Sequence, residues 1–272
     1  MTNAPPPVTT DRTALWLPLL QSLTAASPFW VVWKNVDSAF GGIGDIDAAA
    51  PERDWPLIER EFRQWAEERD LGPVIVCHHI PGGLNLIAVP STMSTLLEVG
   101  VKARRIWRGA TLFVLDDLKP LMMLDPRGFR RIRPGAEGVF KLLLNGARWT
   151  GAPNPAELRR KHVAELLRQD PDGVRMAARL FRPAERAVVR AAERAAEGEW
   201  DRGAILVIQT LALARALRTP TVAAKRARFR LRAKATCPVV STLLRDHRRI
   251  PEDRDAWLRR VAVSHPVLHG NA

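Results

Sequence analysis

Residues 29–50 read FWVVWKNVDSAFGGIGDIDAAA, and this stretch decides the fold. Its first part, FWVVWK at 29–34, is dense in β-branched and aromatic side chains, which is typical of a buried strand. The following NVDSAFGGIG is expected to be a loop or short turn, because Gly41, Gly42 and Gly44 allow backbone angles that are closed to other residues. The pattern therefore predicts a core strand that leads into a glycine-rich turn.

The last part of the stretch, DIDAAA, predicts a second strand. Alternation along that strand places Asp45 and Asp47 on one face and Ile46 on the other. Two aspartates in this arrangement can point at one divalent cation, and Mg²⁺ prefers one or two carboxylates together with phosphate oxygens. The glycines before them would let the backbone approach a triphosphate. The competing interpretation is a solvated strand end without chemistry.

The segments on either side predict a mixed sheet with flanking helices. Helical spacing of leucines favours a short helix over residues 11–23, and a second helix follows Pro51. PVIVCHH at 73–79 and LNLIAVP at 84–90 are typical of two strands joined by a hairpin turn, and LLEVGV at 96–101 is a further strand. The alternation of strands and helices indicates an α/β (α+β) class.

From Pro134 onward the strand signals end and the sequence predicts helices with proline or charged starts. We place a boundary in TGAPNP, at 150–155, because its glycine and prolines suit a connector. The expected organisation is an N-terminal tail and short helix at 1–27, an α/β domain at 28–150, and a basic, all-helical domain at 151–272.

The charge is unevenly distributed. The net charge of the 272-residue chain is +13, and residues 151–272 hold 25 Lys/Arg against 13 Asp/Glu, whereas residues 1–150 hold 17 against 16. From Arg215 to Arg249 there are eleven Lys/Arg and one acid, Asp246. The usual explanation of such a run is a solvated basic face, and the functional alternative is a track for the phosphates of nucleic acid or a nucleotide.

The composition favours a cytoplasmic protein. Cys77 and Cys237 are the only cysteines, too few for a disulfide framework. The first residues carry no basic segment followed by an apolar one, so no secretory signal is expected. The longest apolar run, at 204–214, is about half the length that spans a bilayer. It predicts a buried helix and no transmembrane segment.

Three segments together resemble a bacterial family of nucleotidyltransferase-like proteins. The first is VVWKNVDSAFGGIGDIDAA at 31–49, with its Gly-Asp-Ile-Asp motif. The second, LLEVGVKARRIWRGATLFVLDDL at 96–118, is similar to that family's strand, basic Trp-Arg-Gly segment and acidic stretch. The third, RRIRPGAEGVFKLLLNG at 130–146, resembles its Pro-x-x-Glu helix. They cover roughly half of the chain, and their order and spacing carry the resemblance.

The resemblance implies a nucleotidyltransferase-type fold, with an NTP as the substrate and Mg²⁺ or Mn²⁺ as the cofactor. Asp45 and Asp47 would be catalytic residues and metal ligands. Gly42 and Gly44 would form the turn at the phosphates, and Lys34 would lie near that site.

The family's third carboxylate falls on Gly100, which has no side chain. Glu98 shares a strand face with Gly100 and is the candidate substitute. Asp116 or Asp117 could take the same role if their strand bordered the same sheet. Arg108 is a further candidate for nucleotide binding, since arginine recognises phosphate bidentately.

Three functions therefore stay open. The preferred one is Mg²⁺-dependent transfer of a nucleotidyl group from an NTP to an acceptor that the sequence does not identify. The second is a catalytically inactive module of the same fold that binds a nucleotide or a partner, and Gly100 is its chief support. The third is nucleic-acid binding through residues 215–249. His78 and His79 are poor candidates for one metal site, because neighbours on a strand point to opposite faces.

Overall fold

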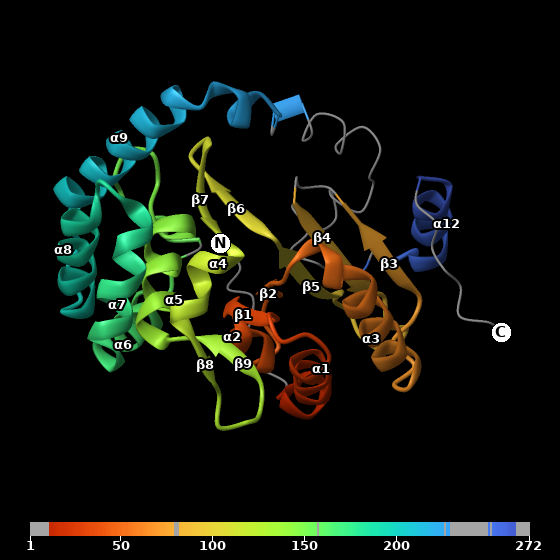
Figure 1. The fold of residues 1–272 in the computed structure, drawn as a ribbon. Coiled ribbons are helices and arrows are strands. Elements are labelled where there is room, and N and C mark those ends of the chain that lie inside the picture. The colour runs from red at the N-terminus through yellow and green to blue at the C-terminus, as the bar shows by residue number, and fades with distance from the viewer. Residues whose placement is uncertain are drawn as a thin grey trace, which may run out of the picture.

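A mixed sheet of seven strands with helices forms the N-terminal part, and a largely helical region follows it (Figure 1). This computed structural model describes residues 11–78, 82–156, 158–225, 227–228, 250 and 252–264. The strands are β1 (Val31–Lys34), β2 (Ile46–Ala49), β3 (Val74–Cys77), β4 (Gly83–Ala88), β5 (Leu97–Lys102), β6 (Arg104–Trp107), β7 (Ala110–Val114), β8 (Met122–Leu124) and β9 (Arg130–Ile132).

The α-helices are α1 (Thr13–Ala26), α2 (Val36–Phe40), α3 (Trp55–Glu67), α4 (Leu115–Leu118), α5 (Pro134–Phe140), α6 (Arg160–Gln169), α7 (Pro171–Ala178), α8 (Glu185–Ala196), α9 (Arg202–Arg218) and α12 (Arg254–Ser264). Short 3₁₀ turns occur at Glu52–Asp54, Lys119–Leu121 and Arg179–Phe181, and α5 continues as a π-helix over Lys141–Asn145.

The strand order is β3-β4-β5-β2-β1-β9-β8. β2 runs parallel to β5 and antiparallel to β1, and its Asp47 is in register with Gly100 of β5 and Lys34 of β1. β4 is antiparallel to β5 and pairs Asn85 with Gly100. The register therefore aligns positions from four parts of the chain across the middle of one sheet face.

One face of the sheet is closed by α1 and α3. Their buried apolar side chains, including Leu20 and Phe62, pack with those of Ile46 and Val99 on the sheet. Trp16 of α1 stacks on Trp65 of α3, with ring centroids 5.2 Å apart. This layer accounts for the apolar positions of the two helices.

The opposite face is covered at its two ends by different parts of the chain. Near β1, the side chains of Val31 and Trp33 pack with the helices that follow β9, as far as α9. Near β3 and β4, the buried Trp257 and Val261 of α12 cover an apolar patch that includes Ile87. Between these two apolar regions lies a strip of buried polar side chains.

Most of the predicted elements are confirmed, with three corrections. NVDSAFGGIG contains a helix, α2, where a loop or turn was expected. β8 and β9 form an unforeseen hairpin that extends the sheet, and β6 and β7 form a separate two-stranded sheet. The C-terminal half is largely helical as predicted, but most of the basic segment 215–249 lies outside the described residues.

The domain boundary predicted at 150–155 does not separate two apolar cores. Trp33 and Ile205, which lie on opposite sides of it in the sequence, belong to one apolar cluster. The division into two domains stays a prediction. In the part of the chain that the structure describes, no helix is long and apolar enough to cross a membrane.

Candidate functional site

Asp45 and Asp47 lie at the start of β2, directly after the glycine turn. Gly42 and Gly44 have φ angles of 76° and 88°, a left-handed conformation that favours glycine. Asp47 is the second residue of β2 and is 7% exposed, and Asp45 precedes the strand. The turn therefore delivers both carboxylates to the same end of one strand, as the alternation predicted.

Lys34 and Asn35 hold these carboxylates from the end of β1. Lys34 Nζ forms an ion pair with Asp47 Oδ2 at 3.0 Å, and both side chains are buried. Asn35 has a φ of 72°, a left-handed conformation that asparagine tolerates. Its Nδ2 donates to Asp47 Oδ2 at 3.1 Å and to Asp45 Oδ1 at 3.4 Å, so one amide bridges the two aspartates.

Two more cations act on Asp47. Burial by itself would raise the pKa of Asp47, but the attraction of Lys34, Lys102 and Arg105 outweighs it, and the pKa lies below its ordinary value. Burial lowers the pKa of Lys102, although Asp47 pulls it upward. We call this group of side chains the β2–β5 cluster, and its members are Lys34, Asp45, Asp47, Asn85, Glu98, Lys102 and Arg105.

Gly100 of β5 lies in the middle of the cluster, beside Asp47 of β2. A Cβ atom built on Gly100 would lie 3.5 Å from Asn85 Nδ2, 3.6 Å from Lys102 Nζ and 3.8 Å from Asp47 Oδ1, which are ordinary contact distances. Three polar atoms thus converge above this glycine. Asn85 is 3% exposed, and its buried Oδ1 has no hydrogen-bond partner among the described residues. Such an oxygen normally accepts a hydrogen bond from protein, water or ligand.

Glu98 faces the same strip but is engaged by its neighbours. It is 4% exposed, and its Oε1 accepts a hydrogen bond from Asn85 Nδ2. It precedes Gly100 by two residues, and its neighbour on β4 is Ile87. Its carboxylate therefore belongs to the cluster, while its proposed substitution for the missing third carboxylate stays a prediction.

Glu137 of α5 supports the cluster from behind. Its Oε1 accepts from the backbone N–H of Asn35 at 2.9 Å, and its carboxylate also pairs with Arg131 at 2.7 Å and Lys141 at 2.9 Å. Burial would raise the pKa of Glu137, but Lys141 and Arg131 lower it to about 2. The carboxylate is therefore ionised, and it fixes the backbone from which the Asn35 side chain reaches the aspartates.

The sequence reasoning did not identify several of these residues. Lys102 lies two positions beyond Gly100, so strand alternation alone could have placed it on the same face. Asn35 follows Lys34 in the quoted motif, and Glu137 is the acid of the Pro-x-x-Glu helix. The sequence pattern gave no indication that Asn85 belongs to the site, because its position beside Gly100 depends on the pairing of β4 with β5.

Other candidates lie away from the cluster. Arg108, at the tip of the β6–β7 hairpin, stacks on Trp149 with its guanidinium carbon 3.6 Å from the ring centroid, and donates to Ala147 O at 3.3 Å. Asp116 and Asp117 belong to α4, and the preceding β7 pairs only with β6. The condition for either aspartate to replace the third carboxylate is therefore not met.

The donor set fits one divalent ion at most. Asp45 and Asp47 would hold it through their carboxylate oxygens, but Lys34 already occupies one oxygen of Asp47. Gly100, where only the family resemblance would place a further ligand, supplies no side-chain oxygen. Among the described residues no group of three or more His, Cys, Asp or Glu is placed to hold a metal ion, and His78 lies beside Trp55 instead.

Comparison with known proteins adds no relative. No family model matches the chain, and neither does any curated protein or solved structure. The geometry of the β2–β5 cluster is therefore the main indication of function.

Proposed function

We propose that the α/β part is a nucleotidyltransferase-type domain that binds the phosphates of a nucleotide at the β2–β5 cluster and acts as a binding module. The observation that carries this proposal is the buried ion pair between Lys34 and Asp47, with Lys102 beside it above Gly100. These ammonium groups act on Asp47, a carboxylate that metal-dependent transfer would need as a metal ligand.

The charge balance of the cluster supports binding without metal. A site built for two Mg²⁺ ions is negative until the ions arrive, because its ligands are carboxylates. Here the carboxylates of Asp45, Asp47 and Glu98 face an equal number of cations. The cations are Lys34, Lys102 and Arg105. Phosphate oxygens could pair with the lysine ammonium groups while the left-handed turn at Gly42 and Gly44 lets the backbone approach them.

The second candidate is Mg²⁺-dependent nucleotidyl transfer to an acceptor. Its support is the Asn35 amide, which holds Asp45 and Asp47 on the same side of the strand. The ion would supply a Lewis acid for the transferred phosphoryl group. The chain's own residues would then orient the triphosphate through Lys34 and the glycine turn.

Calorimetric titration with each of the four NTPs, with Mg²⁺ and with EDTA, separates the two candidates. If the domain is a binding module, NTP binding should persist in EDTA. It should be weaker in Lys102→Met and should remain in Asp45→Asn. Lys119→Met is the matched control, because Lys119 is exposed and outside the cluster. Binding that needs Mg²⁺ and disappears in Asp45→Asn would favour the transferase. Absence of binding with every NTP would contradict both.

Gly100→Asp gives a direct test of the missing carboxylate. The Cβ has room, since its nearest neighbour would be 3.5 Å away, and the new carboxylate would lie close to Asp47 and Lys102. We expect Gly100→Asp to bind Mg²⁺ more tightly than the native chain, measured by calorimetry with the metal alone. Gly100→Ala restricts the backbone in the same way but adds no carboxylate, so it should bind Mg²⁺ no more tightly than the native chain. Equal affinities in the two variants would show that the carboxylate is not what the site lacks.

A further inference from the structure

Helix α9 presents an apolar outer face to solvent. Among the exposed large hydrophobic side chains of the described residues, four lie on this helix: Leu206 at 38% exposure, Val207 at 50%, Leu213 at 46% and Leu217 at 73%. Their spacing places them on one side of the helix together with the exposed Thr210 and Ala214. An apolar helix face of this length is costly to leave in water.

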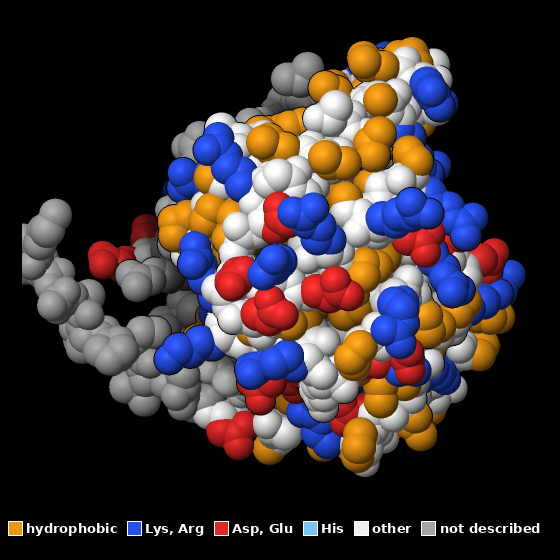
Figure 2. Space-filling view, turned by 90° about the vertical axis from the view of Figure 1, so that its left-hand side faces the viewer, with side chains coloured by type: hydrophobic (Ala, Val, Ile, Leu, Met, Phe, Trp, Pro, Cys, Tyr) orange, Lys and Arg blue, Asp and Glu red, His pale blue; other side chains and the backbone are white. Residues whose placement is uncertain are grey.

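The inner face of α9 is already occupied. Ile205, Ile208 and Ala216 are buried, and Gln209 Nε2 donates to Arg148 O at 2.6 Å. Figure 2, viewed from the side of α8, shows acidic side chains in its middle and lower parts, and hydrophobic and basic ones at its top, where α9 runs. The outer face is therefore a second apolar surface of α9, and no described residue covers it.

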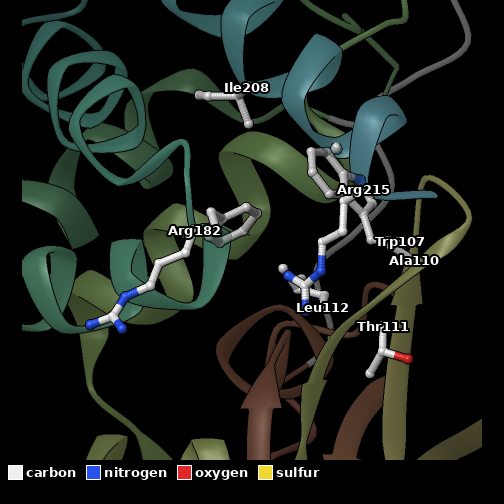
Figure 3. A pocket seen from close by; sticks show the side chains of 9 residues that line it. Trp107, Ala110, Thr111, Leu112, Arg182, Ile208 and Arg215 are labelled. Atoms are coloured by element: carbon white, nitrogen blue, oxygen red, sulfur yellow. The ribbon is translucent and has the colours of Figure 1, made fainter. Parts of the chain in front are cut away.

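A small pocket lies between α9 and the β6–β7 hairpin, and the exposed leucines of the outer face do not line it. It is lined by Ile208 and Arg215 of α9, by Trp107 of the hairpin and by Arg182. In Figure 3 the Arg215 side chain runs from α9 toward Leu112, while Arg182 points away from it. The two arginines thus do not converge on one ligand position in this pocket.

Helix α9 and the segment that follows it carry basic charge only, although Asp201 caps the start of the helix. From Arg202 to Arg245 the sequence contains ten Lys/Arg and no Asp or Glu. Arg202 and Arg218 of α9 are exposed and, on a helical projection, lie at the two borders of the leucine face; Lys225 and Arg228 further along are also exposed. An apolar strip bordered by arginines is typical of helices that lie in the surface of an anionic bilayer.

We propose that the outer face of α9 docks on an anionic lipid surface, with Leu206, Leu213 and Leu217 in the acyl boundary and the flanking arginines at the headgroups. A second copy of the chain fits the face less well, because association through it would bring the exposed cations Arg202, Arg218 and Lys225 of two chains together. Nucleic acid would use the arginines but would leave the leucines without a partner.

The test is flotation of the purified full chain with vesicles of phosphatidylcholine alone and vesicles that also contain phosphatidylserine. We expect binding to the second kind only. Leu213→Gln with Leu217→Gln should weaken this binding about tenfold or more, because the apolar contact is lost. Arg218→Gln with Lys225→Gln should weaken it and reduce its dependence on salt. Leu124→Gln is the control, since Leu124 of β8 is 64% exposed and far from α9 in the fold.

Three results would overturn the proposal. The first is no binding of the native chain to anionic vesicles. The second is unchanged binding by the double leucine variant, which would indicate an electrostatic track of the kind that nucleic acid uses. The third is a native dimer in solution that the leucine variant converts to a monomer. All changed side chains are exposed, and circular dichroism would confirm that each variant is folded.

Discussion

Lys34 contributes directly to keeping Asp47 ionised, because its Nζ pairs with this buried carboxylate at 3.0 Å. Removing one partner of a buried pair leaves an uncompensated charge and costs about 3–5 kcal/mol. Lys34→Met should therefore lower the free energy of unfolding by about that amount at pH 7. Urea unfolding measures it.

The matched control for Lys34→Met is Lys119→Met. Lys119 pairs with Asp116 at 2.7 Å, but their side chains are 47% and 78% exposed. An exposed pair contributes about 0–1 kcal/mol. Equal losses in the two variants would show that Asp47 does not depend on Lys34.

At the scale of the element, two glycines let α5 pack very closely against α6 and α7. A Cβ on Gly135 would lie 1.9 Å from the backbone oxygen of Asp170, and one on Gly138 would lie 2.8 Å from the Leu167 side chain. Because Glu137 lies between these glycines, the packing of α5 against α6 and α7 also positions the carboxylate that binds the backbone of Asn35.

Gly135→Ala should therefore destabilise the protein by about 1–3 kcal/mol or more, since a backbone atom cannot move aside as a side chain does. Thermal and urea unfolding measure the loss. Gly203→Ala in α9 is the control: its new Cβ would meet nothing nearer than 3.4 Å, and alanine is favoured over glycine in helices by up to about 1 kcal/mol. A stable Gly135→Ala protein would mean that α5 and α7 can separate without cost.

At the scale of the whole molecule, a buried ionic network joins the sheet to the helices. Arg131 of β9 pairs with Glu137 of α5 at 2.7 Å, with Asp37 of α2 at 3.1 Å and with Asp125 at 3.2 Å. Burial opposes the ionisation of Asp125, but hydrogen bonds from Arg127 and Arg131 prevail, and its pKa falls to about 2. The network therefore requires charged carboxylates.

This network predicts the acid sensitivity of the fold. The pKa of Glu137 in the folded protein, about 2, is below its ordinary 4.5, so the unfolded chain binds protons first as the pH falls. The stabilisation is complete above about pH 4.5 and is lost as the pH falls toward 2. Glu137→Gln should be less stable at neutral pH and lose less stability across this range. Urea unfolding at a series of pH values tests this, and parallel curves would contradict it.

The sequence alone determined the strands β1 and β2 and the facing of the two aspartates. Strand alternation depends only on local backbone geometry, so residues 29–34 and 45–49 could be interpreted from their pattern. The glycine turn was predicted for the same reason, although α2 within it was missed because Val36 to Phe40 is a single short helical segment. The hairpin of β8 and β9 was missed because its strands have only three residues each.

Only the tertiary structure decided which side chains meet. Lys34, Asn85 and Lys102 come from three strands, and they surround Asp47 because β1, β2, β5 and β4 are adjacent in a particular register. The exposure of α9 was likewise unforeseen: its apolar run predicted a buried helix, but the hairpin and the neighbouring helices cover only one side of it. Burial and pairing depend on long-range contacts, which local sequence patterns do not specify.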